Sequence, residues 1–317
     1  MAAKFPAAVL SAAVVLAACQ EPSAPTAPNH PAATFATEQA PVGLGPAERA
    51  ALLADRVNAR LAAKGVSMRL GGATFFTVGQ GVPEFRRLRT GDRWQTRGLT
   101  YILDDAHYTT DVAPADVDAA LVAAQATWGT VPNAGISTTR VPKPAVGNIE
   151  LLDQIILDGS GACVDIEDPG FDGPYADIVT YGWIDPAYFS NCLGSDQIIG
   201  VTWTFFDPTD ANHDNFDDLV YAEQYFNPAF KYTTTDAVYL DFTAPIDIQS
   251  VFVHEDGHTL GLDHTGGPNP NQPFKLHPDG RVFDPEAIMN PGYLGGEKRS
   301  LFPLDMAALR TLYARPN

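Results

Sequence analysis

The stretch that decides the fold is His254-Glu255-Asp256-Gly257-His258-Thr259-Leu260-Gly261-Leu262-Asp263-His264. Histidines four residues apart lie on one face of a helix, so His254 and His258 can both reach one metal ion. Gly261 lets the helix end in a left-handed turn, which a residue with a Cβ would resist. The chain then turns back, and His264 supplies a third nitrogen ligand.

Glu255 follows the first histidine, where its carboxylate can take a proton from a water molecule at the metal. Three protein ligands with an open fourth position are typical of a catalytic zinc site rather than a structural one. The simpler alternative is an amphipathic core helix that carries histidines by chance. The motif reading is favoured because every fixed position of HExxHxxGxxH is matched in a chain with only 7 histidines.

Length and charge set limits on the class of protein. The chain has 317 residues, which is long enough for a sizeable core and one or two domains. Its formal net charge of −18 argues against binding to nucleic acid or to anionic lipid. Charged residues make up 18% and aromatic residues 10%, which is a globular composition.

The N-terminus has the features of an export signal. Lys4 precedes an apolar run from Ala7 to Ala18 that is too short to span a bilayer. The sequence Leu16-Ala17-Ala18-Cys19 resembles the bacterial lipobox, which implies a signal peptide over 1–18 and a lipid anchor on Cys19. An ordinary signal peptide cut nearby is the alternative. Either version predicts an exported protein, in the bacterial cell envelope as a lipoprotein or otherwise secreted.

If Cys19 carries lipid, two cysteines remain, Cys163 and Cys192. In an oxidising compartment outside the cytoplasm they can form a disulfide. A disulfide between them would close a loop of about 30 residues, which stabilises by roughly 3–4 kcal/mol in the chain-entropy model. Two unpaired buried thiols are the alternative.

Patterning along the chain predicts a Pro/Ala-rich tether over 19–45 and a small helix-plus-strand extension over 46–92. This extension is a possible prosegment. The domain that follows covers 93–317. The predicted helices are Pro46–Lys64, Asp116–Trp128, the helix of the histidine motif and Pro303–Tyr313, and the predicted strands are Arg69–Val78, Leu99–Leu103, Ala176–Tyr181, Ile198–Phe206 and Asp218–Phe226.

Several lines of sequence, in their order along the chain, carry a family resemblance. They are LTYILDD, ADVDAALVAAQATW, ADIVTYGW, DIQSVFVHEDGHTLGLDH, AIMNPGY and PLDMAALRTLY. Residues 93–317 resemble the catalytic domain of the matrixin branch of the metzincin zinc peptidases. The resemblance implies an α/β (α+β) domain with a twisted, mostly parallel five-stranded sheet and two long helices. A loop-rich C-terminal subdomain with a Met-turn and a terminal helix would follow.

The resemblance also implies roles, residue by residue. His254, His258 and His264 resemble the zinc ligands, and Glu255 resembles the general base and acid. Met289 resembles the Met-turn residue, and Tyr293 is expected to form a wall of the substrate pocket. The family implies that a protein or peptide substrate pairs with a sheet edge, for which Ile198–Phe206 is the candidate.

The sequence departs from the family pattern at particular places. Asp256 replaces an apolar residue, and because a buried unpaired carboxylate is costly, we expect it to reach solvent or a partner. The stretch from His264 to Met289 is longer than in compact matrixins. The histidine cluster of a second, structural zinc and the cysteine motif of a latent prosegment are both missing.

A second ion site is predicted at Asp210, Asn212, Asp214, the Phe216 carbonyl and Asp218, where oxygen ligands follow the first part of an EF-hand-type calcium loop. No acid stands at the twelfth position, and a solvated polar turn is the alternative.

Together these patterns predict a zinc-dependent endopeptidase that hydrolyses proteins outside the cytoplasm. The alternatives are a non-catalytic surface binding module that keeps the zinc fold, and a zinc amidase that acts on a cell-wall amide.

Overall fold

A computed structural model describes residues 43–313, except for 80, 88–91, 105–106, 146–154, 158–162, 166–173, 210–212, 215, 236, 239–240, 242, 266–274, 277–281 and 284–285. The predicted signal peptide, most of the tether and Cys19 therefore lie outside the described residues. Thr37–Asn317 forms one compact unit, and the predicted boundary at residue 92 falls within it.

The described helices are α1 (Pro46–Ala63), α2 (Pro114–Gly129), α3 (Ile248–Thr259), α4 (Pro303–Tyr313) and a π-helix, η1 (Tyr188–Cys192). The large sheet contains β1 (Arg69–Val78), β2 (Phe85–Arg86), β3 (Asp92–Trp94), β4 (Gly98–Leu103), β5 (Ser137–Arg140), β8 (Ile178–Trp183), β9 (Ile198–Asp207), β10 (Asp217–Phe226) and β15 (Gly292–Tyr293). Three small pairs are β6 (Ile155–Leu157) with β7 (Cys163–Asp165), β11 (Tyr232–Thr233) with β12 (Ile246–Asp247), and β13 (Lys275–Leu276) with β14 (Val282–Phe283). In the described part of the chain, no helix combines the length and apolar character needed to cross a membrane.

The large sheet has the strand order β15-β1-β9-β10-β8-β4-β5, with β2 paired to β1 and β3 paired to β10. Along this path β9 is antiparallel to both of its neighbours, and the other strand pairs are parallel. The prediction of a mixed α/β protein with a mostly parallel sheet is confirmed. The prediction of five strands is wrong, because the described sheet has 9 strands.

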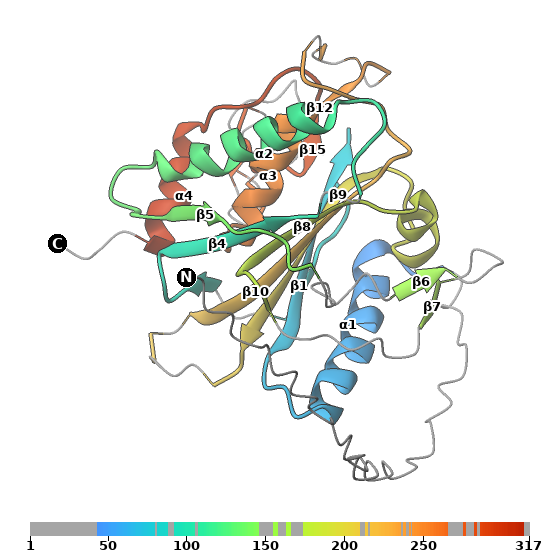
Figure 1. The fold of residues 1–317 in the computed structure, drawn as a ribbon, viewed down its shortest axis with the longest axis vertical. Coiled ribbons are helices and arrows are strands. Elements are labelled where there is room, and N and C mark those ends of the chain that lie inside the picture. Colours follow the sequence, from blue (N-terminus) through green and yellow to red (C-terminus); the bar gives the residue numbers. More distant parts are fainter. Residues whose placement is uncertain are drawn as a thin grey trace, which may run out of the picture. The chain divides into compact units, whose positions relative to one another are not determined.

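The sheet is covered on both faces, as the alternation of side chains along β1 shows. Phe75 belongs to a core with α1 residues such as Leu53 and Val57, whereas Phe76 belongs to a core with α2 and α3 residues. Successive residues of a strand point to opposite faces, so α1 covers one face and α2 and α3 cover the other. In Figure 1, α2, α3 and α4 gather together, away from α1.

Strand β1 of the N-terminal extension belongs to the large sheet. It pairs with β9 from Arg69↔Phe206 to Thr77↔Ile198, and its end pairs with β15. The prediction that Ile198–Phe206 is a free edge for substrate is therefore wrong, because β1 and β10 cover both sides of β9. The sequence predicted the strand over 69–78 with its observed bounds, but gave no sign of its partner.

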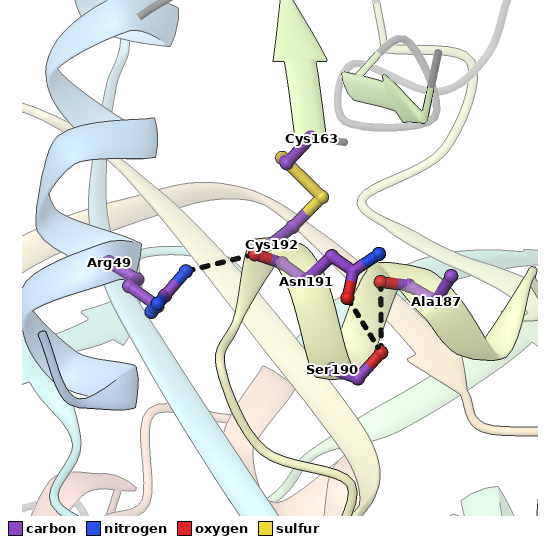
Figure 2. Close-up of a disulfide and its surroundings, with 6 residues drawn as sticks. All are labelled: Arg49, Cys163, Ala187, Ser190, Asn191 and Cys192. Carbon is purple, nitrogen blue, oxygen red and sulfur yellow. Dashed lines mark hydrogen bonds between the residues drawn. A yellow bond between two sulfur atoms is a disulfide. The ribbon is translucent and has the colours of Figure 1, made fainter. Parts of the chain in front are cut away.

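A disulfide joins Cys163 at the start of β7 to Cys192 at the end of η1, as predicted, with the Cα atoms 5.0 Å apart (Figure 2). Beside it, the Arg49 guanidinium of α1 donates a hydrogen bond to the Asn191 carbonyl, with an N–O distance of 2.9 Å. The N-terminal helix is therefore tied to the region of the disulfide as well as to the sheet.

If β1 belongs to the main core, Phe75→Ala should destabilise the whole unit. Phe75 is fully buried, and truncation of a buried Phe lowers the free energy of unfolding by about 3–5 kcal/mol. Urea unfolding followed by circular dichroism measures the change. Leu52→Ala on the exposed side of α1 is the matched control and should change the same quantity by no more than about 0.5 kcal/mol. An unchanged main transition in Phe75→Ala would mean that residues 46–92 fold separately.

Candidate metal centre

Helix α3 is buried along nearly its whole length, so its ends must be satisfied within the protein. At the N-terminus, the Asp247 carboxylate accepts hydrogen bonds from the Ser250 backbone N–H at 2.9 Å and from the Ser250 hydroxyl at 2.5 Å. At the C-terminus, Gly261 has φ +86, and the Leu262 N–H reaches back to the Gly257 carbonyl at 3.1 Å. The predicted left-handed stop at Gly261 is therefore confirmed.

The three motif histidines converge as predicted. Their Nε2 atoms lie 3.0 Å apart between His254 and His258, and His264 Nε2 is 3.1 Å from each of the other two. The residues are 0%, 1% and 7% exposed for His254, His258 and His264. Among the described residues, these three form the group of side chains that could hold a metal ion.

The other ring nitrogens fix which way each imidazole faces. His254 Nδ1 lies 2.7 Å from the Ile288 carbonyl, and His258 Nδ1 lies 2.8 Å from the Leu262 carbonyl. A carbonyl only accepts, so each Nδ1 carries the proton and each Nε2 presents its lone pair to the centre. Burial, together with the positive charge that neighbouring histidines would carry, lowers the pKa of His254 and of His258 well below the usual value. Both rings are therefore neutral, which is the form that binds a metal. The donor set fits a zinc ion.

Glu255 is fully buried next to this cluster. Its Oε2 accepts a hydrogen bond from the Thr202 hydroxyl of β9 at 2.5 Å, and its Oε1 has no hydrogen-bond partner among the described residues. Burial raises the pKa of Glu255 to about 8; the Thr202 hydrogen bond opposes this rise, and the charge of Asp256 adds to it. A cation at the histidines would act in the opposite direction, because positive charge favours the carboxylate. A Cβ at Gly200 would lie 2.6 Å from Oε1, so glycine there leaves room for the carboxylate.

Asp256 is also fully buried, and the expected partner is present. Its Oδ1 accepts hydrogen bonds from the side-chain amides of Gln125 on α2, at 2.8 Å, and Gln224 on β10, at 3.0 Å. Burial raises its pKa to about 8, and the two amides only partly oppose this. Asp256 thus links α3 to a second helix and to the sheet.

Met289 lies directly against α3. A Cβ at Gly257 would lie 2.3 Å from Met289 Sδ and 2.7 Å from Trp128 Cζ2, so only glycine fits at this point of the helix. The Asp305 carboxylate of α4 accepts hydrogen bonds from the backbone N–H groups of Ile288, at 2.9 Å, and Met289, at 3.1 Å. Helix α4 thereby holds the turn whose Ile288 carbonyl orients His254.

Tyr293 on β15 is buried, and its hydroxyl is already engaged. It donates to the Gly296 carbonyl at 2.8 Å and accepts from the Asp247 N–H at 3.0 Å. Burial raises its pKa well above the usual value. Its ring meets the edge of Phe76. The ring therefore packs close to the three histidines, while the hydroxyl accepts a hydrogen bond from the residue that caps the N-terminus of α3.

Two residues of the N-terminal extension contact the histidines and were missed from the sequence. The ring of Phe76 on β1 stacks on His254, with centroids 3.7 Å apart and planes at 12°. The Glu84 carboxylate accepts a hydrogen bond from His264 Nδ1. Burial raises the pKa of Glu84, but His264, with smaller contributions from His258 and Arg86, lowers it to about 2, so Glu84 is a carboxylate.

The predicted calcium loop is only partly within the described residues, since Asp210 and Asn212 lie outside them. Asp214 forms an ion pair with Arg93, and Asp218 accepts a hydrogen bond from Gln95 at 2.6 Å. Phe216 lies beneath the Arg93 guanidinium. Calcium binding here stays a prediction.

Comparison with known proteins adds no family assignment: no family model matches this chain, and no curated protein matches it. The site must therefore be interpreted from its own chemistry.

The ligand assignment predicts that His258→Ala removes tight zinc binding from the purified protein. The loss of one of three converging imidazoles leaves two ligands, which hold the ion much more weakly. Metal content after dialysis, measured by atomic emission, tests this directly. His213→Ala at an exposed position is the matched control and should keep one zinc per chain. One zinc per chain in His258→Ala as well would contradict the assignment.

Proposed function

We propose that this protein is a zinc-dependent endopeptidase, related to the matrixin branch of the metzincins, that hydrolyses peptide bonds of proteins outside the cytoplasm. The single observation that carries the proposal is the convergence of three imidazole nitrogens beside a buried carboxylate, one oxygen of which has no hydrogen-bond partner among the described residues. The position of Met289 against α3 and the sequence resemblance of residues 93–317 support the same conclusion.

His254, His258 and His264 would hold the zinc ion through Nε2. When bound, zinc supplies Lewis acidity, which lowers the pKa of a water molecule to about 7 and polarises a substrate carbonyl. The protein contributes the orientation of the three rings, through the Ile288 and Leu262 carbonyls and Glu84. It also excludes bulk solvent, because the three rings are buried.

Glu255 would act as the general base and then as the general acid. Its Oε1 takes the proton of the attacking water and returns that proton to the nitrogen of the leaving amine. The Thr202 hydroxyl holds Oε2 and so leaves Oε1 as the reacting atom. Both proton transfers, from the water and to the leaving amine, need only a carboxyl group that is held in place, as Glu255 is by Thr202.

The covered edge of β9 limits how a substrate reaches Glu255. With β1 and β10 on both sides, an extended peptide cannot add to β9 while β1 stays in place. This observation favours one alternative, a zinc amidase acting on a compact cell-wall amide, because such a substrate needs no free strand edge.

Export and a lipid anchor at Cys19 also belong to the proposal. The Cys163–Cys192 disulfide supports an oxidising compartment. Cys19→Ser should move the protein from the membrane fraction to the soluble fraction, since the lipid attaches through that thiol. Immunoblots of fractionated cells measure this, and a membrane-bound Cys19→Ser protein would point to a different attachment.

The mechanism predicts that Glu255→Gln keeps zinc and the fold but lowers kcat for peptide hydrolysis by about 10²–10⁴-fold, the usual contribution of a positioned acid and base. Cleavage of casein and of a fluorogenic peptide library gives the rates, and metal analysis verifies the zinc.

Glu48→Gln on the exposed first turn of α1 is the control and should keep the full rate. Unchanged hydrolysis in Glu255→Gln would exclude the mechanism. A zinc-loaded unmodified protein that cleaves cell-wall amides but no peptide would support the amidase, and one that cleaves neither would support a binding module.

A further inference from the structure

The three histidines of the metal centre differ in what holds their outer nitrogens. His254 and His258 each donate from Nδ1 to a neutral backbone carbonyl close to the motif. His264 instead donates from Nδ1 to the Glu84 carboxylate, which lies 180 residues earlier in the chain. One ligand therefore depends on a charged side chain of the N-terminal extension.

The backbone places Glu84 there through a hairpin. Strand β2 returns along β1 with the register Gly72↔Arg86 and Ala73↔Phe85, and Glu84 immediately precedes it. Arg86 forms an ion pair with Asp263, the neighbour of His264. Residues two apart in an extended segment point to the same side. Glu84 and Arg86 therefore contact two consecutive residues of the motif, His264 and Asp263.

Glu84 is an outer partner of the site and not a fourth ligand. Its oxygen bonds the nitrogen of His264 that faces away from the other imidazoles, and the group of described ligand atoms consists of the three histidines alone. A carboxylate in this position fixes the tautomer, so that Nε2 is free to bind the metal.

We propose that Glu84 is a positioning residue for His264, and that the segment from β1 to β2 completes the metal centre. This inference rests on the zinc site of the proposed function. Phe76 supports it independently, because its stacked ring fixes the plane of His254 from the same segment. Two of the three ligands are thus oriented by residues of the N-terminal extension.

The test uses the full chain and measures zinc affinity by competition with a chromophoric chelator. Glu84→Ala should weaken zinc binding by about 10–100-fold, the usual cost of removing an outer-shell partner. Glu84→Gln keeps an oxygen acceptor without the charge, so it should lose less. Glu48→Ala and Glu48→Gln are the matched controls and should keep the affinity of the unmodified protein.

A second readout separates positioning from folding. In cobalt-substituted protein, Glu84→Gln should shift the visible absorption bands, which report ligand geometry, while its circular dichroism stays native. Unchanged affinity and unchanged bands in both Glu84 variants would overturn the proposal. So would faster hydrolysis at unchanged zinc affinity, since the segment would then block the site. Zinc affinity does not depend on hydrolysis, so a protein without peptidase activity would refute the proposed function and leave this inference standing.

Discussion

Burial of helix α3 is the constraint on which the rest of the structure depends. The helix places four ionisable side chains where bulk water does not reach them, namely His254, Glu255, Asp256 and His258. An ionisable group in such a place must become neutral or find partners. His254 and His258 are neutral and donate to backbone carbonyls, Asp256 accepts from two amides, and Glu255 accepts from Thr202. Each partner comes from a different element, so satisfying one helix ties together α2, β9, β10 and the Met289 turn.

Burial also means that backbone carbonyls of α3 need hydrogen-bond partners within the protein, and tryptophan and tyrosine side chains provide several of them. Trp128 Nε1 donates to the Val253 carbonyl at 2.8 Å, and Trp94 Nε1 donates to the Thr259 carbonyl at 2.7 Å. The Tyr313 hydroxyl donates to the Leu260 carbonyl at 2.9 Å. The last carbonyls of a helix lack partners within it. Trp94 and Tyr313 supply such partners at the C-terminal end of α3, whereas Trp128 donates to a carbonyl in the middle of the helix. All three large side chains also fill the surrounding space.

The sequence predicted well whatever depends on local pattern. The strand over 69–78 follows from its run of aromatic and β-branched residues, and the helix over 303–313 follows from Pro303 at its start and Asp305 in its first turn. The convergence of the histidines follows from their spacing. The sequence did not predict contacts between residues that are far apart in the chain. Nothing in residues 69–78 indicates that β9 lies beside them, and Glu84 sits in no motif. The pairing of β1 is decided by complementary buried faces, which one sequence alone does not reveal.

That long-distance pairing also sets the order in which the molecule can assemble. Thr74 meets Thr202, 128 residues later, and contacts between such distant segments form slowly because the intervening chain must first be brought together. The edge of β1 that pairs with β9 has no partner during synthesis until β9 is made. The turn at Met289 and the carboxylate of Asp305, which orient His254, emerge later still. The centre is therefore assembled only when nearly the whole polypeptide is present, and a truncated chain has the histidines but not the geometry.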